Sequence, residues 1–187
     1  MTSEPASWSL AELFEAADPR RGPPPVHLWA PANCGDIDIR IRKDGVWMHE
    51  GSPIGRPELV RLFSSVLRRD DDGIYLVTPV ERLRIVVEDA PFVAIGVERA
   101  GAAVRFVTNV GELVEAGPDH AIRVETGAGG EPRPYLHVRR GLEALIARQV
   151  FYDLVEMGEA RPSPEGPRLT IASNGATFDL GALDGGP

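Results

Sequence analysis

Two carboxylates and two guanidiniums follow one another in the segment DIDIRIR, in which charged residues alternate with Ile37, Ile39 and Ile41. Side chains of a β-strand point alternately to opposite faces, so this pattern predicts a strand with a buried isoleucine face and an ionic face. On the ionic face, Asp36 and Asp38 could accept hydrogen bonds from a ligand, or form a solvated surface that nearby arginines balance. A metal site is the least favoured interpretation, because such a site usually needs three or more converging ligands.

A loop between a predicted strand and a predicted helix could bind an anion. In Gly51–Arg56, free backbone amides and the positive end of the helix would meet, and Arg56 could add a bidentate contact. The Gly-Lys-Ser/Thr ending of a phosphate-binding loop is absent, however, and Pro57 removes one amide donor. The alternative, which we favour slightly, is a tight turn in which Arg56 pairs with an acidic neighbour.

Further polar side chains could contribute to a binding site. Arg148 and Tyr152 stand four residues apart on a predicted helix and share a face, with Arg139 just before that helix. They could form a cationic and aromatic wall for a phosphate or a base, or equally a cation–π or salt-bridge rim beside the core. Polar residues at predicted strand ends could line a seam, although turn chemistry explains each one taken alone. These residues are Thr78, Glu81, Glu88, Asp89, Thr108 and Asn109.

The chain has a single cysteine, Cys34, and four histidines whose spacing supports neither nucleophilic catalysis nor a metal site. A free cysteine is usually a small buried residue, and we expect the same of Cys34. A single cysteine forms no internal disulfide, which suits the reducing cytoplasm. We therefore expect no cofactor and no metal.

Composition excludes several classes of partner. The formal net charge of -8 argues against DNA or RNA, because phosphate binding needs a surplus of lysine and arginine. A local arginine pocket for one small anion remains compatible with this charge. The first residues lack a signal-peptide pattern, and no apolar run has the length of a membrane span, so we expect a cytoplasmic protein with no membrane span.

Turn and capping signals divide the chain into short elements. Ser9–Glu12 is a capping box, Pro57 suits a first helical turn, and the dipeptides at Asp44 and Asn174 are hairpin turns. Helices are predicted at 9–17, 57–69 and 142–157, and strands at 36–43, 46–50, 74–78, 82–88, 92–98, 103–108, 121–125, 135–139, 169–173 and 176–180.

The order strand, strand, helix, strand, strand occurs twice in this prediction, over 36–88 and over 121–180. Strands that cluster around a single helix favour an α+β fold with antiparallel sheets. The residues of the two copies match poorly, so duplication is a structural hypothesis and not a sequence repeat.

Several blocks of sequence together resemble a bacterial family known as domain of unknown function 1285. They are CGDID at 34–38, GRP at 55–57 followed by LVRLF at 59–63, LVTPVE at 76–81, VEDAPF at 87–92, FVTN at 106–109, and YLHVR at 135–139 leading into LEAL at 142–145 and FY at 151–152. The resemblance covers nearly everything after Pro25. It implies two related α+β subdomains, the second like a pleckstrin-homology fold, with a cleft for a nucleotide-like ligand and a signalling role. We expect a lead-in over 1–25, an N-terminal subdomain over 26–90 and a C-terminal subdomain over 91–187.

We therefore predict a ligand-sensing or signalling adaptor with a polar cleft between its subdomains, and we favour a binding protein over an enzyme. The first alternative is a protein–protein interaction module that uses exposed edges of the second sheet. A hydrolase that uses Asp36 and Asp38 is the weakest alternative, because no nucleophile–base pair accompanies them. The predicted ligand-binding residues are Asp36, Asp38, Arg56, Thr78, Glu81, Asn109, Arg139, Arg148 and Tyr152.

Overall fold

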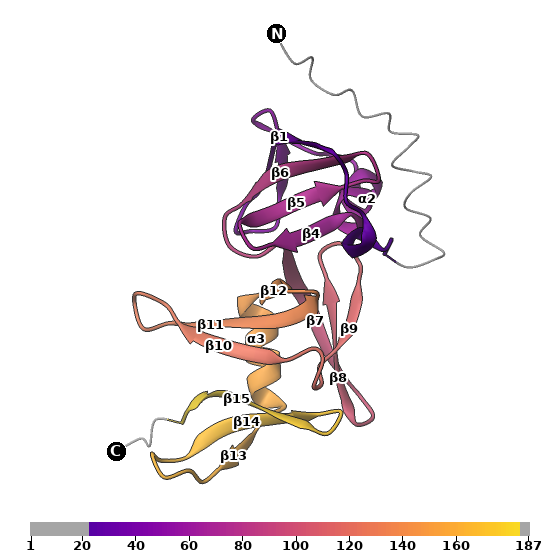
Figure 1. Cartoon of the computed structure of the whole chain (residues 1–187). Helices are drawn as coiled ribbons and strands as arrows, with labels where there is room; N and C mark the ends of the chain where they lie inside the picture. Colours follow the sequence, from indigo (N-terminus) through magenta and orange to yellow (C-terminus); the bar gives the residue numbers. More distant parts are fainter. Residues whose placement is uncertain (1–22, 184–187) are drawn as a thin grey trace. The chain divides into compact units, whose positions relative to one another are not determined.

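A computed structural model describes residues 23–183, which form a mostly-β α+β fold divided into two compact units (Figure 1). The described part of the first unit includes 23–41 and Val46–Val87. The second unit includes Arg42–Gly45 and the described residues from Glu88 onward. The helix predicted at 9–17 lies outside the described residues.

The first unit is built on a six-stranded mixed sheet in the order β3-β2-β1-β6-β5-β4. Strands β1 and β6 pair in parallel, whereas all the other neighbours are antiparallel. The elements are a short 3-10 helix η2 (Val26–Leu28), β1 (Asn33–Ile41), β2 (Trp47–His49), β3 (Ser52–Pro53), α2 (Pro57–Ser65), β4 (Leu67–Asp70), β5 (Gly73–Val77) and β6 (Glu81–Val87).

The alternating charged and isoleucine residues at 36–41 lie on β1. Ile39 and Ile41 are buried and Asp38 and Arg40 are exposed, as predicted, whereas Ile37 is only half-buried. The predicted hairpin turn follows β1, and Gly45 adopts the positive φ of 83° that such a turn requires.

The helix predicted at 57–69 is too long, because α2 ends at Ser65 and the next residues form β4. In β4, Leu67 is buried and pairs with Leu76 of β5 in an antiparallel register. Leucine and arginine suit a helix by propensity, but pairing with a neighbouring strand decides their conformation here.

The second unit contains another six-stranded mixed sheet, in the order β10-β11-β12-β7-β8-β9, and a three-stranded sheet in the order β13-β14-β15. Strands β12 and β7 form the parallel pair of the larger sheet. The elements are β7 (Phe92–Ala100), β8 (Ala103–Thr108), β9 (Leu113–Glu115), β10 (Ile122–Thr126), β11 (Pro132–Arg139), β12 (Leu142–Ile146), α3 (Arg148–Glu156), β13 (Glu159–Arg161), β14 (Arg168–Ser173) and β15 (Ala176–Ala182).

The long helix predicted at 142–157 is wrong over its first part. Leu142, Ala144 and Ile146 are buried at alternate positions of β12, which lies between two other strands of the sheet. The period of two is the signature of a strand, and α3 begins only at Arg148.

The expected antiparallel sheets are also corrected, since each six-stranded sheet contains one parallel pair. The two sheets nevertheless share one strand order, in which each half of the sheet has three consecutive strands and the two halves meet at the parallel pair. The equivalent segments are β1–β6 and β7–β12, so the second copy does not start near residue 121. The helices are not equivalent, because α2 follows the third strand of its sheet and α3 follows the sixth.

Candidate functional site

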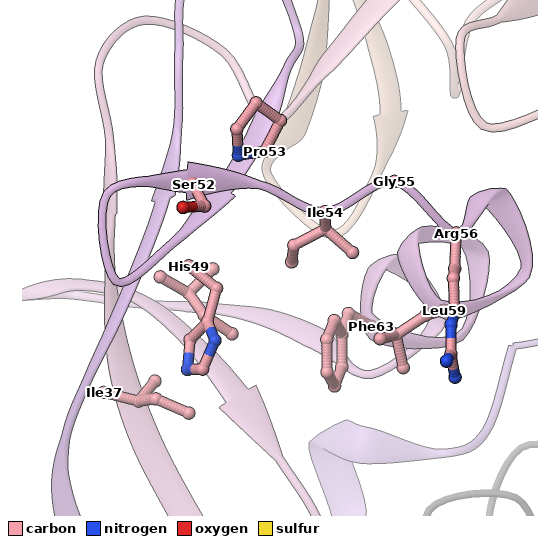
Figure 2. Close-up of a pocket in the computed structure, with 10 residues that line it drawn as sticks. Ile37, His49, Ser52, Pro53, Ile54, Gly55, Arg56, Leu59 and Phe63 are labelled. Atoms are coloured by element: carbon pink, nitrogen blue, oxygen red, sulfur yellow. The ribbon is translucent and has the colours of Figure 1, made fainter.

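A pocket of about 460 Å³ lies in the first unit, between strands β1–β3 and helix α2 (Figure 2). This volume is within the range of small-molecule sites, roughly 300–1,000 Å³. The lining is mostly apolar, with three polar side chains. It consists of Ile37, Ile39, His49, Ser52, Pro53, Ile54, Gly55, Arg56, Leu59 and Phe63.

The local structure explains how the apolar wall forms. The alternation of β1 places Ile37 and Ile39 on one face of the strand. Leu59 and Phe63 stand four residues apart on α2, so they share one face of that helix. The Ile54 amide donates a hydrogen bond to the carbonyl of Trp47 at 2.8 Å, which fixes the loop between β3 and α2 against β2.

The polar groups of the pocket are His49, Ser52 and Arg56. Arg56 is the N-cap residue of α2, and its backbone carbonyl accepts hydrogen bonds from the amides of Leu59 and Val60 at 3.1 and 3.2 Å. Its side chain is exposed, and no carboxylate within residues 23–183 forms an ion pair with it. The alternative in which Arg56 pairs with an acidic neighbour therefore does not hold in the described part of the chain. The guanidinium is available for an anionic ligand.

Asp36 and Asp38 are exposed on β1 and do not line the pocket. Asp36 stands opposite Arg84 of β6 in the parallel register, which agrees with a solvated surface balanced by arginines. Within residues 23–183, no group of three or more histidine, cysteine, aspartate or glutamate side chains could hold a metal ion.

Thr78 lies in the turn between β5 and β6, and Glu81 is the first residue of β6. Thr78 is buried, and its Oγ1 accepts hydrogen bonds from the amides of Val80 and Glu81 at 3.3 and 3.0 Å. These hydrogen bonds are the turn chemistry of a threonine, which is the alternative to ligand binding.

Asn109 and Arg139 make structural contacts within the second unit. Asn109 Oδ1 accepts a hydrogen bond from the Val93 amide at 3.0 Å, and its Nδ2 donates to the carbonyl of Gly45 at 3.2 Å. Arg139 forms an ion pair with Glu112, and its guanidinium lies 5.0 Å from the ring centroid of Phe92. These contacts satisfy both side chains without a ligand.

Arg148 and Tyr152 contact each other on the exposed side of α3. Arg148 Nε donates to the Tyr152 hydroxyl at 2.7 Å, and the guanidinium lies 5.6 Å from the ring centroid. The pair matches the cation–π alternative, and neither residue lines the pocket.

Cys34 is exposed, so the expectation of a buried thiol is wrong. It lies among the first residues of β1, all exposed, before the part of the strand that enters the core.

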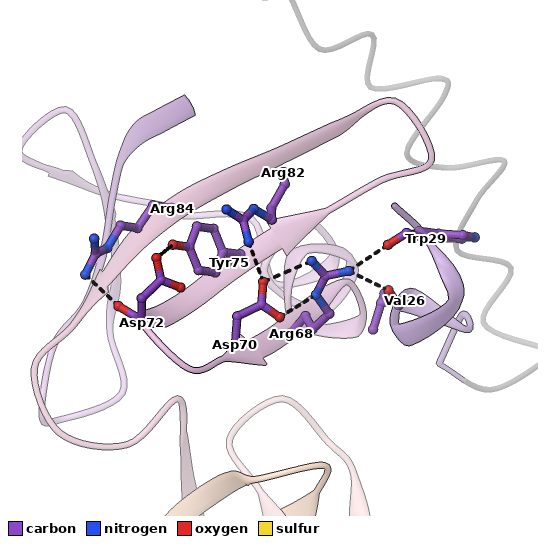
Figure 3. Close-up of polar contacts among 8 residues, drawn as sticks. All are labelled: Val26, Trp29, Arg68, Asp70, Asp72, Tyr75, Arg82 and Arg84. Atoms are coloured by element: carbon purple, nitrogen blue, oxygen red, sulfur yellow. Dashed lines mark hydrogen bonds and ion pairs between the residues drawn. The ribbon is translucent and has the colours of Figure 1, made fainter. Parts of the chain in front are cut away.

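An ionic cluster on β4 and β6 was missed by the sequence reasoning (Figure 3). Asp70 accepts hydrogen bonds from Arg68 Nε at 2.7 Å and from Arg82 Nη1 at 2.9 Å. Arg68 Nη1 also donates to the carbonyls of Val26 and Trp29, at 3.0 and 2.8 Å. Partial burial alone would raise the pKa of Asp70, but the hydrogen bonds and charges of the two arginines lower that pKa overall. The cluster fixes the segment before β1 onto β4, which is a structural role.

The pocket residues were only partly anticipated from the sequence. Arg56 and its loop were singled out, whereas Ile37 and Ile39 were expected on a buried face and no role in binding was predicted for Leu59 or Phe63. The half-burial of Ile37 distinguishes a pocket wall from a core position, and no sequence pattern reports it.

The sequence of this chain matches two known protein domains. Residues 24–90 match a domain described as "Domain of unknown function (DUF1285), N-terminal domain", and residues 91–180 match "Protein of unknown function (DUF1285), C-terminal domain". The chain belongs to the DUF1285 family. The resemblance stated from the sequence blocks is thereby confirmed.

Two crystal structures of DUF1285 family proteins resemble this one. The protein from Silicibacter pomeroyi DSS-3 is 48% identical, with a TM-score of 0.83 over 94% of this chain and 95% of that chain. The protein from Shewanella baltica OS155 is 29% identical, with a TM-score of 0.52 over 63% of this chain and 90% of that chain. The search of curated proteins gave no significant match. Within residues 23–183, no helix is long and apolar enough to cross a membrane.

Proposed function

We propose that this DUF1285 protein is a ligand-sensing module that binds an amphipathic anion in the pocket of its first unit. The observation that carries the proposal is the combination of an apolar cavity of about 460 Å³ with the guanidinium of Arg56 at its lining. Ligand sites are typically apolar, with a few polar groups that fix orientation. The side chains of His49 and Ser52, the histidine and serine of the pocket, form no hydrogen bond with each other within residues 23–183, so binding is a better account than catalysis.

The lining favours a ligand with a hydrocarbon body over a nucleotide. A base and a ribose need several hydrogen-bond partners, and the pocket provides side chains of this kind only at His49, Ser52 and Arg56. An apolar body would gain free energy from contact with Ile54, Phe63 and their neighbours, while its anionic group contacts the arginine. The nucleotide-like ligand, the cleft between the subdomains and the pleckstrin-homology likeness remain predictions.

Titration of the purified full chain tests the proposal. We expect octanoate or decanoate to raise the melting temperature with increasing concentration, because a ligand of the native state stabilises it by mass action. Adenosine and guanosine monophosphates should give a smaller shift or none. Isothermal titration calorimetry then gives the dissociation constants.

Two arginine variants give the matched control. Arg56→Gln should weaken binding of the carboxylate roughly 10- to 100-fold, since a charge-assisted hydrogen bond contributes about 1.5–3 kcal/mol. Arg61→Gln changes an exposed arginine of the same helix that does not line the pocket, and it should leave the affinity unchanged. Absence of binding by every amphipathic acid, or equal losses in both variants, would contradict the proposal.

The alternative of a protein-interaction module is supported by one strand. Strand β9 is at the edge of the second sheet, and Leu113 on it is 65% exposed. Unpaired edge strands can pair with another chain. If no small molecule binds, self-association measured by light scattering before and after Leu113→Arg tests this edge.

A further inference from the structure

The polar side chains of the pocket lie in two separate groups, one on strands β2 and β3 and one at the start of α2. His49 of β2 and Ser52 of β3 are directly paired in the antiparallel register. Arg56 begins α2, and Figure 2 shows it on the opposite side of the view from His49, with Ile54 and Phe63 between them. The pocket therefore has a polar group at each end and apolar side chains between them.

The two polar ends of the pocket differ in chemistry. The guanidinium of Arg56 is permanently charged and has a planar set of donors that suits a carboxylate. Ser52 has a hydroxyl that donates and accepts, and the imidazole of His49 can do the same through its two nitrogens. Within residues 23–183, no hydrogen bond is made by the side chain of either residue. Both groups are available for a neutral polar group of a ligand.

We infer that the ligand is bipolar: a fatty-acid-type carboxylate whose chain carries a hydroxyl group far from the carboxylate. The carboxylate contacts Arg56, the hydrocarbon chain covers Ile54 and Phe63, and the hydroxyl group exchanges hydrogen bonds with His49 and Ser52. His49 and Ser52 are exposed to solvent, so a ligand with an apolar end would replace their water with hydrocarbon, which costs free energy. This inference rests on the proposed function and adds the chemical class of the ligand.

Calorimetry with matched pairs of acids tests the inference. Each unbranched acid from hexanoate to dodecanoate is compared with its ω-hydroxy counterpart on the full chain. In water a hydroxyl group makes the chain end more polar and weakens purely apolar binding. We expect the opposite order for at least one chain length, with the hydroxy acid bound roughly three- to tenfold more tightly because of its hydrogen bonds.

Variants of the pocket distinguish the preference for a hydroxy acid from the binding of amphipathic acids in general. His49→Leu, combined with Ser52→Ala, should abolish the advantage of the hydroxy acid, so that the plain acid of the same length binds at least as tightly. His27→Leu changes an exposed histidine outside the pocket and should alter neither affinity. If plain acids bind in an Arg56-dependent way but every hydroxy acid binds more weakly, the bipolar ligand is wrong and the proposed function stands. If neither class binds, both fail.

Discussion

The two six-stranded sheets have the same strand order, yet their helices enter at different points of the chain. In the first sheet, α2 follows the third strand and encloses the pocket together with β1–β3. In the second sheet, α3 follows the sixth strand and packs near β7. A shared strand order therefore provides a scaffold, while the place at which the helix is inserted determines which strands can form a pocket with it.

The largest expected effect concerns the buried faces of the two sheets. Ile39 of β1 and Leu136 of β11 are both buried, and replacing either with alanine should cost about 2–5 kcal/mol of unfolding free energy. Only Ile39 lines the pocket, so only Ile39→Ala should also change ligand affinity. Urea denaturation and calorimetry measure the two effects. If Leu136→Ala lost as much ligand affinity as Ile39→Ala, the affinity would depend on the overall stability of the protein and not on contacts within the pocket.

The second comparison uses two hairpin turns. Gly45 and Gly175 have similar positive φ values of 83° and 79°. A Cβ on Gly45 would lie 2.8 Å from atoms of Asn109 and Val93, whereas a Cβ on Gly175 would meet nothing within 4 Å. Backbone strain acts on both, but steric overlap acts on Gly45 alone, so Gly45→Ala should cost about 2–4 kcal/mol and Gly175→Ala about 1–2. If the two variants had equally lowered melting temperatures, the side chains around Gly45 would be able to move away from the added methyl group without a loss of stability.

The third comparison uses two acidic residues with lowered pKa values. Asp70 is held by two arginines, and its side chain is 21% exposed. The hydrogen bond from Arg168 lowers the pKa of Asp179, whose side chain is 48% exposed. Because the pKa of Asp70 lies below its ordinary value of 3.8, its carboxylate stabilises the folded state above that pH. The stabilisation is lost as the pH falls through the lower, folded-state pKa.

Asp70→Asn should therefore cost about 1–3 kcal/mol at neutral pH and make stability less dependent on pH in the acidic range. Asp179→Asn should have little measurable effect, since exposed ion pairs contribute little. Urea denaturation from neutral to acidic pH checks both variants. If the unfolding free energy of Asp70→Asn fell with decreasing pH as steeply as that of the unmutated protein, the contacts with Arg68 and Arg82 would not stabilise the carboxylate.

Local signals in the sequence were sufficient for the turns. The dipeptides at Asp44 and Asn174 predicted hairpins, because each turn needs residues that tolerate positive φ, and Asn174 and Gly175 have φ values of 47° and 79°. The ends of helices were less predictable. At 67–70 and 142–146 the residues suit a helix by propensity, but each segment pairs with the adjacent strand of a hairpin, β5 or β11, and β12 also pairs with the distant strand β7. A single sequence does not report such pairing.

The candidate site was predicted at its charged residue and missed at its apolar wall. Arg56 was visible because charge beside a strand-to-helix loop has a recognisable chemistry. Ile37 and Phe63 follow the same periodic pattern in a pocket wall as in a core, so periodicity cannot separate the two. The polar residues at Thr78 and Asn109 fulfil backbone roles, as their turn chemistry allowed.

The last comparison concerns two tyrosines at matched places, each in the fifth strand of its sheet. Tyr75 of β5 donates a hydrogen bond to Asp72 at 2.7 Å, and Tyr135 of β11 donates one to Asp89 at 2.8 Å. In both cases the ring centroid lies 4.4 Å from a guanidinium carbon, that of Arg82 or Arg123 respectively. The same motif thus occurs in both units, and both tyrosines are buried, with an exposed fraction of 4%.

Burial raises the pKa of Tyr135 to about 12, with a further contribution from its hydrogen bond to Asp89. The hydrogen bond to Asp72 raises the pKa of Tyr75, but by a smaller amount. A folded-state pKa above the ordinary value of 10.0 means that the protonated tyrosine stabilises the fold below that pH, and that this stabilisation is lost as the pH rises through the folded-state pKa. Ultraviolet titration of the unmutated protein, with Tyr135→Phe and Tyr75→Phe subtracted in turn, should therefore assign the later ionisation to Tyr135. If Tyr75 ionises last, its hydrogen bond to Asp72 has a larger effect on the pKa than the burial of Tyr135 and the hydrogen bond of Tyr135 to Asp89.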